Sequence, residues 1–214
     1  MLNNVLELIL IFTAYIIGSL PFAVWVGKLF YGIDVREFGS GNAGATNVFR
    51  VLGKKAGIPV LMLDVLKGVA AVALATFSDF NSHSTPLINY QIAIGIAAVL
   101  GHIFPLFAGF RGGKGVATLL GVGVAITPIG AGMAVMVFLV MLLVFRYVSL
   151  ASMSAGLSFP FIVLVVLHNS PVSLIIFSFM VAALLIITHK KNIQRLLKKQ
   201  EPKINLKLVK VKAK

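Results

Sequence analysis

The segment GAGMAVMVFLVMLLVFR (130–146) decides the class of fold, because sixteen successive residues carry no charge before an arginine ends the run. A helix that crosses the hydrocarbon core of a bilayer needs about 20 mostly apolar residues, with a range of about 17–25. Similar apolar segments recur along the chain, at 5–27, 56–77, 88–108, 115–127, 150–167 and 172–188. We therefore expect an all-α, polytopic membrane protein with seven transmembrane helices.

The segment 115–127 is shorter than the others, is rich in glycine and stops at Thr127-Pro128. It is either a tilted or broken helix, or one half of a long hairpin with the segment that follows. Seven spans are the prediction, and five or six spans are the alternatives.

The composition of the whole chain agrees with a membrane protein. Of 214 residues, 59% are apolar and 12% are charged, against about 45–50% and about 25% in ordinary soluble domains. These values exclude a water-soluble globular domain, a disordered chain and a coiled coil. The net charge of +13 would suit a nucleic-acid-binding protein, but so apolar a chain would not stay soluble as one, so no nucleic acid is expected. The absence of cysteine excludes disulfides and Cys-ligated metals.

The basic residues predict the orientation, because the cytoplasmic loops of membrane proteins carry an excess of Lys and Arg. With seven spans and the N-terminus outside, 18 of the 19 basic residues lie on the inner side. The remaining one, Lys67, lies within the second span. We expect an outside N-terminus and a cytoplasmic C-terminus. The first residues lack the basic region of a signal peptide, so the first helix is expected to stay uncleaved.

The chain is expected to divide after residue 197. Residues 1–197 form the membrane domain, and residues 198–214 alternate lysine with apolar residues as a basic cytoplasmic tail. Each lysine contributes about 1 kcal/mol near an anionic leaflet. Membrane lipids are therefore expected partners of the tail.

Three polar segments fall on the inner side, and the most informative is GFRGGKGVAT (109–118). Glycines allow the backbone to point several N–H groups into one concavity. Arg111 and Lys114 add positive charge, and a helix starting at about Val116 would add the positive end of its dipole. The segment predicts a phosphate or carboxylate site, and the alternative is a tight turn with basic flanks. Its glycines are Gly109, Gly112, Gly113 and Gly115.

The segment GSGNAGATN (39–47) has the same character but with neutral donors, and Arg50 follows one helical turn after Thr46. A solvated loop is the alternative, although such loops more often use Lys, Glu and Pro. The small residues indicate that something packs closely against this loop. The candidate donors are Ser40, Asn42, Thr46 and Asn47.

The segment HKKNIQRL (189–196) ends the last span. His189 and Asn192 share a helix face because they are three residues apart, and a basic helix end among lipid headgroups is the alternative. His102 lies near the inner mouth of its span, either as a helix-end hydrogen bonder or as a site residue. No cluster of potential ligands predicts a metal.

Asp64 and Lys67 are also three residues apart, within the second span. A charge in a membrane costs about 2.5–3.5 kcal/mol on insertion scales, so these two residues are expected to pair. The pair is either structural, or it directs Lys67 toward the anion site.

Four motifs together resemble the bacterial acyl-phosphate:glycerol-3-phosphate acyltransferases, the PlsY family. The resemblance covers residues 10–196 and implies seven helices in the bacterial inner membrane with the active site on the cytoplasmic side. It also implies transfer of a fatty acyl group from acyl phosphate to the 1-hydroxyl of sn-glycerol 3-phosphate, which gives lysophosphatidic acid and phosphate. No metal or other cofactor is expected, and the protein is expected to be a monomer. The motifs are GSGNAGATNVFRVLGKKAG (39–57), DVLKG (64–68), GHIFPLFAGFRGGKGVAT (101–118) and HKKNIQRL (189–196).

The resemblance and the residue patterns together give two sets of site residues. The expected catalytic set is Ser40, Arg50, Lys114, His189 and Asn192. The expected substrate-binding set is Asn42, Thr46, Asn47, Lys67, His102, Gly109, Arg111, Gly112, Gly113 and Gly115. The third motif of the family is expected to read H-x-E-N, whereas this chain has Lys191 at the glutamate position. Either another partner holds this helix end, or the pairing has been replaced.

Because acyl phosphate is an activated donor, the resemblance implies direct attack by the glycerol hydroxyl, with an acylated Ser40 as the alternative. Arg50, Lys114 and backbone N–H groups would stabilise the phosphate and the developing oxyanion. The base is either His189, whose ordinary pKa of about 6.5 suits the task, or a phosphate oxygen of a substrate. The competing functions are a transporter or flippase for an organic phosphate and a structural membrane subunit. Three polar motifs on one membrane side favour the enzyme.

Overall fold

The computed structural model describes residues 2–82, 84–168 and 170–204, and every regular element within these ranges is a helix. The all-α prediction is therefore confirmed for the described part of the chain. Short 3-10 segments η1 (Val35–Glu37), η2 (Leu74–Phe77) and η3 (Leu106–Ala108) and the π-helical η4 (Ile162–Val166) accompany the α-helices. The α-helices are α1 (Leu2–Gly18), α2 (Phe22–Tyr31), α3 (Ala45–Leu52), α4 (Lys54–Ala73), α5 (Thr85–Ile103), α6 (Val116–Ile126), α7 (Pro128–Phe145), α8 (Val148–Phe161), α9 (Val172–Thr188) and α10 (Lys190–Leu197).

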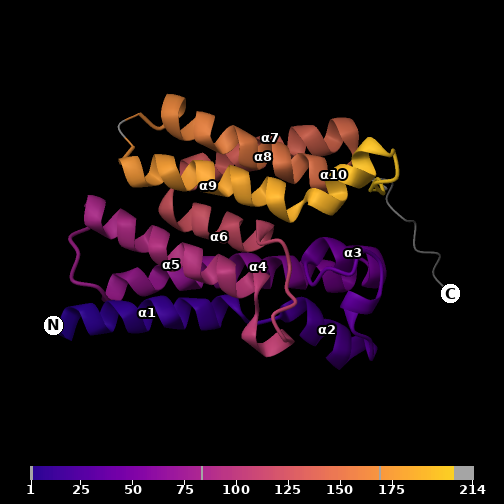
Figure 1. The fold of residues 1–214 in the computed structure, drawn as a ribbon, viewed down its shortest axis with the longest axis horizontal. Coiled ribbons are helices and arrows are strands. Elements are labelled where there is room, and N and C mark those ends of the chain that lie inside the picture. Colours follow the sequence, from indigo (N-terminus) through magenta and orange to yellow (C-terminus); the bar gives the residue numbers. More distant parts are fainter. Residues whose placement is uncertain (1, 83, 169, 205–214) are drawn as a thin grey trace.

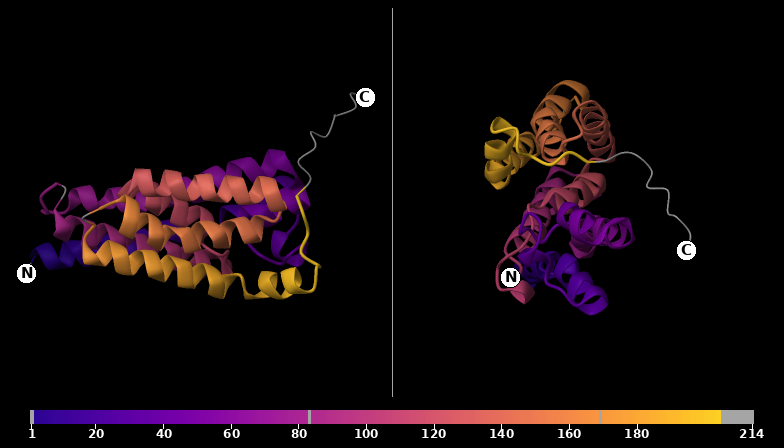
Figure 2. Two further views of the ribbon diagram at one scale, coloured as in Figure 1. Left: turned by 90° about the horizontal axis from the view of Figure 1, so that it is seen from above. Right: turned by 90° about the vertical axis from the view of Figure 1, so that its right-hand side faces the viewer.

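The long helices run side by side in two layers (Figures 1 and 2). Helices α1, α4 and α5 form one layer, α7, α8 and α9 form the other, and α6 lies between them. Buried apolar side chains of α5, α6, α8 and α9 form one core across the two layers. A second core joins α1, α4 and α5, and a third lies where α2 and α3 meet α4.

Close backbone contact holds α6 against α4. A Cβ atom on Gly121 of α6 would overlap the carbonyl oxygen of Val65, and one on Gly68 of α4 would overlap that of Thr118. Small residues let helix backbones approach in a membrane, where lipid supplies no hydrophobic drive for association. Gly68 and Gly121 therefore fix the position of the helix that begins directly after Gly115.

Five helical stretches of the described residues are long and apolar enough to cross a membrane: 5–31, 54–77, 85–108, 128–145 and 148–166. The pair formed by α9 and α10, bent by 60°, makes a sixth if it is counted as one span. Helix α6 is apolar but has 11 residues, which is about 16 Å at about 1.5 Å per residue against a core of about 30 Å. The protein is thus a multi-pass membrane protein. The short apolar element predicted at 115–127 corresponds to α6.

The first predicted span, 5–27, contains a break. Helix α1 ends at Gly18 and α2 begins at Phe22, because Pro21 has no backbone N–H and its ring obstructs a continuous helix. The carbonyl oxygen of Leu20 in this break accepts a hydrogen bond from Nζ of Lys67 at 3.0 Å. The predicted boundaries are otherwise within a few residues of the observed helices.

One end of the bundle holds most of the chain's polar structure. Helices α2, α3 and α10 gather toward the right-hand side of Figure 1, together with the start of α6. The beginning of α1 lies at the opposite end. The three polar segments singled out by the sequence therefore belong to the same end of the molecule.

Candidate active site

The loops of the first two motifs touch each other. The N–H of Ala43 donates to the carbonyl oxygen of Gly112 at 3.4 Å. Each loop leads directly into a helix, α3 at Ala45 and α6 at Val116. Gly115 has a φ of 84°, which favours glycine, and this turn lets the chain enter α6 directly after Lys114.

Lys114 connects the second motif to the third. Its Nζ donates a short hydrogen bond to Oδ1 of Asn192 on α10. Burial lowers the pKa of Lys114 to about 8; Glu201 opposes this shift, and the positive charges of Arg195 and Arg50 add to it. Arg50 of the first motif therefore shares an electrostatic environment with Lys114. The three motifs together concentrate positive charge at one place.

Glu201 supplies a carboxylate that the sequence patterns did not identify. Its side chain is buried; Oε1 accepts hydrogen bonds from Asn192 at 2.6 Å and Ser149 at 2.8 Å, and Oε2 accepts one from Arg195 at 2.7 Å. Burial alone would raise the pKa of Glu201, but the hydrogen bonds from Arg195, Asn192 and Ser149 outweigh it, so the pKa lies below its usual range.

Lys191 is exposed on the same helix, and the carboxylate that contacts α10 is that of Glu201, which follows the helix. A signal was present in the sequence, because Glu201 is the one acidic residue after Asp79. An isolated acidic side chain within a strongly basic segment is expected to pair with a nearby basic residue.

Residues 198–204 cross the end of the bundle, from α10 to the turn between α7 and α8 (Figure 2). The N–H of Ile204 donates to the carbonyl oxygen of Arg146 at 2.9 Å, and Nζ of Lys203 lies 5.2 Å from the ring centre of Tyr147. This part of the predicted tail therefore packs on the membrane domain. Residues 205–214, the rest of the predicted tail, lie outside the described residues.

His189 follows the last residue of α9 and is buried. Its Nδ1 lies 2.8 Å from the carbonyl oxygen of Leu185. Because a carbonyl can only accept a hydrogen bond, Nδ1 carries the hydrogen and Nε2 keeps its lone pair in the neutral ring. Burial, followed by the charge of Lys114, lowers the pKa of His189 to about 4. The imidazole is therefore neutral at pH 7, with a lone pair at Nε2, and it is less basic than an exposed histidine.

Asn47 holds the loop of the first motif in shape. Its Oδ1 accepts from the backbone N–H of Ser40 at 2.8 Å and from the Ser40 hydroxyl at 3.1 Å. Its Nδ2 donates to the carbonyl oxygens of Val35 at 2.7 Å and Phe38 at 3.1 Å. Asn47 is 1% exposed, so its amide is engaged with the chain and orients Ser40.

The remaining candidates of the first motif face outward. Thr46 and Arg50 are exposed and Asn42 is half-buried. Within the described ranges, the Arg50 guanidinium makes no hydrogen bond or ion pair. Arg50 is therefore available to an anion that approaches this end of the bundle.

A second contact that the sequence did not predict holds the outer part of the glycine-rich loop. Nη1 of Arg36 donates to the carbonyl oxygen of Ala108 at 2.7 Å, while its Nε and Nη2 bind Asp34 at 2.9 and 2.7 Å. The hydrogen bonds from Arg36 hold the pKa of Asp34 well below its usual range. Gly109 and Arg111 are exposed in this part of the loop.

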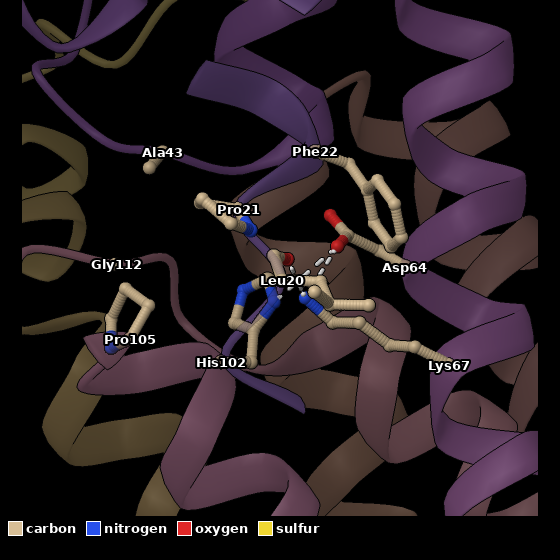
Figure 3. A pocket seen from close by; sticks show the side chains of 9 residues that line it. All are labelled: Leu20, Pro21, Phe22, Ala43, Asp64, Lys67, His102, Pro105 and Gly112. Carbon is tan, nitrogen blue, oxygen red and sulfur yellow. Dashed lines mark hydrogen bonds and ion pairs between the residues drawn. The ribbon is translucent and has the colours of Figure 1, made fainter. Parts of the chain in front are cut away.

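Lys67 and His102 lie in a buried cluster with Asp64 (Figure 3). Nζ of Lys67 is 2.8 Å from Oδ1 of Asp64, and Nδ1 of His102 is 3.5 Å from the same oxygen. The predicted pairing of Asp64 with Lys67 is confirmed. Gly112 and His102 line the same small pocket, so the cluster lies directly against the glycine-rich loop.

An apolar groove of about 290 Å³ lies between α5, α6 and α9. Its lining includes Ile187, close to His189 in the chain, and Val99. A Cβ atom on Gly115 would lie 3.1 Å from Cγ1 of Val99, so the groove also approaches the residue that follows Lys114. A large apolar space therefore adjoins a concentration of positive charge. Among the described residues, no three His, Asp or Glu side chains are placed to hold a metal ion.

Comparison with known proteins gives consistent results. The sequence model of the family described as glycerol-3-phosphate acyltransferase matches residues 8–199. Glycerol-3-phosphate acyltransferases from Bacillus cytotoxicus and Listeria monocytogenes are 45% and 46% identical, over 92% and 89% of this chain and 94% and 93% of theirs.

Two solved structures are similar over nearly the whole chain. The crystal structure of PlsY, an integral membrane glycerol 3-phosphate acyltransferase, in its glycerol 3-phosphate form is 41% identical with a TM-score of 0.82, covering 93% of this chain and 96% of that one. Its lysophosphatidic acid form is 40% identical with a TM-score of 0.79, covering 93% and 95%.

Proposed function

Since this chain belongs to the glycerol-3-phosphate acyltransferase family, we propose that acyl phosphate is the donor of the acyl group that it transfers to glycerol 3-phosphate. The observation that carries this proposal is the apolar groove whose lining includes Val99, which lies against Gly115 directly after Lys114, and Ile187, two residues before His189. A donor with a fatty chain and a phosphate head needs an apolar space that ends at positive charge. The two PlsY structures, in glycerol 3-phosphate and lysophosphatidic acid forms, agree with the acceptor and the product of this reaction.

Each substrate has a place in this arrangement. The acyl chain lies in the groove lined by Val99 and Ile187, with its carbonyl carbon near His189. Lys114 and Arg50 hold phosphate groups, because both cations belong to the same electrostatic environment and cations with backbone N–H groups stabilise phosphate charge. Glycerol 3-phosphate enters between the two glycine-rich loops from the aqueous end.

The chemical step is a direct displacement. The oxygen of the glycerol 1-hydroxyl forms a bond to the acyl carbon, and the bond from that carbon to the phosphate oxygen breaks. Nε2 of His189 accepts the hydroxyl proton, inorganic phosphate leaves, and lysophosphatidic acid remains. No acyl-enzyme is required, and the Ser40 hydroxyl donates its hydrogen bond to Oδ1 of Asn47, which is not a base.

His189 is tested as the base by two variants. His189→Ala and His189→Gln should lose similar activity, about 10²–10⁴-fold, which is the contribution typical of a positioned acid or base. If His189→Gln instead keeps substantial activity, the ring only orients a substrate and a phosphate oxygen is the base. His168→Ala is the matched control, because that histidine is exposed and belongs to the turn between η4 and α9.

The topology is also part of the proposal. Counted as a short, tilted crossing, α6 completes seven spans, with the N-terminus outside and the C-terminus cytoplasmic. The enzyme would then act as a monomer at the cytoplasmic face of the bacterial inner membrane. The excess of basic residues on the side that carries the three motifs supports this orientation.

The donor is tested by supplying palmitoyl phosphate and glycerol 3-phosphate, without metal, to the detergent-purified protein. We expect phosphate and lysophosphatidic acid in equal amounts, with both products lost in Lys114→Ala. Lys198→Ala removes an exposed lysine that follows α10 and lies outside the four motifs, and it should keep wild-type turnover. Acyl transfer from acyl-CoA but not from acyl phosphate would contradict the proposed donor.

A further inference from the structure

The buried cluster of Asp64, Lys67 and His102 is not used by the proposed reaction, although it lies against the substrate loop (Figure 3). Asp64 and Lys67 come from α4, and His102 comes from the last turn of α5. Their exposed fractions are 1%, 4% and 6%. The three ionisable side chains therefore form a cluster that is almost completely buried from solvent.

Three contacts among the described residues hold the side chain of Lys67 in place. Its ammonium group binds Asp64, donates to the carbonyl oxygen of Leu20 at 3.0 Å and lies 5.5 Å from the ring centre of Phe22. The ammonium thus ties α4 to the break between α1 and α2. Lys67 is therefore held in the cluster by Asp64 and by the chain at the break.

His102 transmits the position of the cluster to the glycine-rich loop. A Cβ atom on Gly113 would overlap Nε2 of His102, so the ring lies flush against the backbone of this glycine. The N–H of Gly113 also donates to the carbonyl oxygen of His102 at 3.1 Å, and the N–H of Gly112 donates to that of Ile103 at 3.2 Å. The next residue is Lys114. The ring is held on its other side by Asp64.

Stability alone does not account for this cluster. A buried ion pair is often no more stable than apolar residues of the same size, because desolvation of both charges offsets their attraction. Oδ2 of Asp64 is, in addition, buried without a hydrogen-bond partner among the described residues, which adds to the cost. What the cluster does provide is a fixed position for one ring.

We propose that Asp64 and Lys67 are positioning residues for glycerol 3-phosphate. They fix the ring of His102, the ring fixes the backbone of Gly113, and that backbone sets where Lys114 meets the substrate phosphate. This inference rests on the proposed function, because the proposed function places glycerol 3-phosphate at the glycine-rich loop.

The main test removes both charges together. In Asp64→Leu/Lys67→Met neither charge is left unpaired, so the protein should fold with a melting temperature close to that of the wild type. We expect KM for glycerol 3-phosphate to rise about tenfold or more, with kcat and KM for palmitoyl phosphate within about twofold of wild type. Tyr90→Phe, a buried change in the first half of α5, is the matched control and should leave all three constants unchanged.

A second variant acts on the ring alone. His102→Asn leaves Asp64 and Lys67 paired and should produce the same selective rise in KM for glycerol 3-phosphate. In the variant that combines all three substitutions, this KM should rise no further than in the double variant or in His102→Asn. Hydrogen exchange of the peptide covering 109–115 should be faster in every variant, and this readout needs no turnover.

Wild-type kinetics in a folded double variant, or unchanged exchange of that peptide in His102→Asn, would overturn the proposal. Equal losses in kcat and in both KM values would also overturn it, because they indicate a general structural defect. Failure of the wild type to transfer acyl groups in the same assay would instead count against the proposed donor.

Discussion

Nζ of Lys114 is hydrogen-bonded to Oδ1 of Asn192, 78 residues further along the chain, and Nδ2 of the same amide donates to Glu201. A neutral amide therefore stands between the lysine and the glutamate. Lys114 is oriented by this contact without being neutralised by a direct ion pair. Its positive charge stays available for a phosphate.

The variant Asn192→Asp should weaken the binding of both phosphate substrates. It places a carboxylate directly on Lys114 and next to Glu201, so the local positive charge falls. We expect KM for both substrates to rise about tenfold or more, since a charge-assisted hydrogen bond contributes about 1.5–3 kcal/mol. Steady-state kinetics at two ionic strengths check this. Gln194→Glu adds the same charge on the exposed side of α10, and an equal effect there would refute the explanation.

The affinity for glycerol 3-phosphate should fall at alkaline pH. Burial lowers the pKa of Lys114 to about 8, so the ammonium is charged below that pH and neutral above it. KM for glycerol 3-phosphate should therefore rise as pH increases through about 8, up to tenfold per pH unit. In Lys114→Arg the guanidinium stays charged, so any activity that remains should lack this alkaline limb. A limb that persists unchanged in Lys114→Arg would assign it to another group.

Glu201→Gln should lower both stability and activity. The amide keeps the size of the side chain but loses the charge that accepts hydrogen bonds from Asn192, Ser149 and Arg195. Hydrogen bonds to buried charged groups contribute about 1.5–3 kcal/mol, so the free energy of unfolding should fall by about that amount. Thermal unfolding in detergent measures it. Glu37→Gln, an exposed acid at the same end of the molecule, should unfold like the wild type.

The groove should select donors by chain length. Filling it with Leu184→Trp leaves the charged residues in place but removes space for the acyl chain. KM for palmitoyl phosphate should rise several-fold, while KM for octanoyl phosphate should change less. Leu143→Trp, which is exposed on α7 outside the groove, serves as the control. An equal effect on both donors would indicate that the chain lies elsewhere.

The sequence predicted those features that depend on local pattern. Hydropathy predicted the long apolar helices but not α3 or the break between α1 and α2, and the i, i+3 spacing predicted the pairing of Asp64 with Lys67. It could not show that the second partner of Asp64 is His102, because α4 and α5 approach only through tertiary packing. Asn47 shows the same limit, since an amide can hold a ligand or a loop equally well and only the fold decides.

The contribution of Glu201 was missed for a related reason. Reasoning from helix spacing stops where α10 ends, at Leu197. The chain reverses there because Lys199 adopts a left-handed conformation, with a φ of 55°, and Gln200 donates to the carbonyl oxygen of Arg195 at 2.7 Å. This turn returns Glu201 to Asn192. Such a turn at a non-glycine residue has no clear signature in the sequence.

The crossing of the bundle end by residues 198–204 has a consequence for biosynthesis. Asn192 and Arg195 receive their carboxylate partner from a residue that follows every membrane helix of the described chain. During synthesis the glycine-rich loops are therefore made before the carboxylate that completes the network around Lys114. The segment that supplies this carboxylate also joins α10 to Ser149 of α8, so the last helix is tied to an earlier one only when residue 201 has been made.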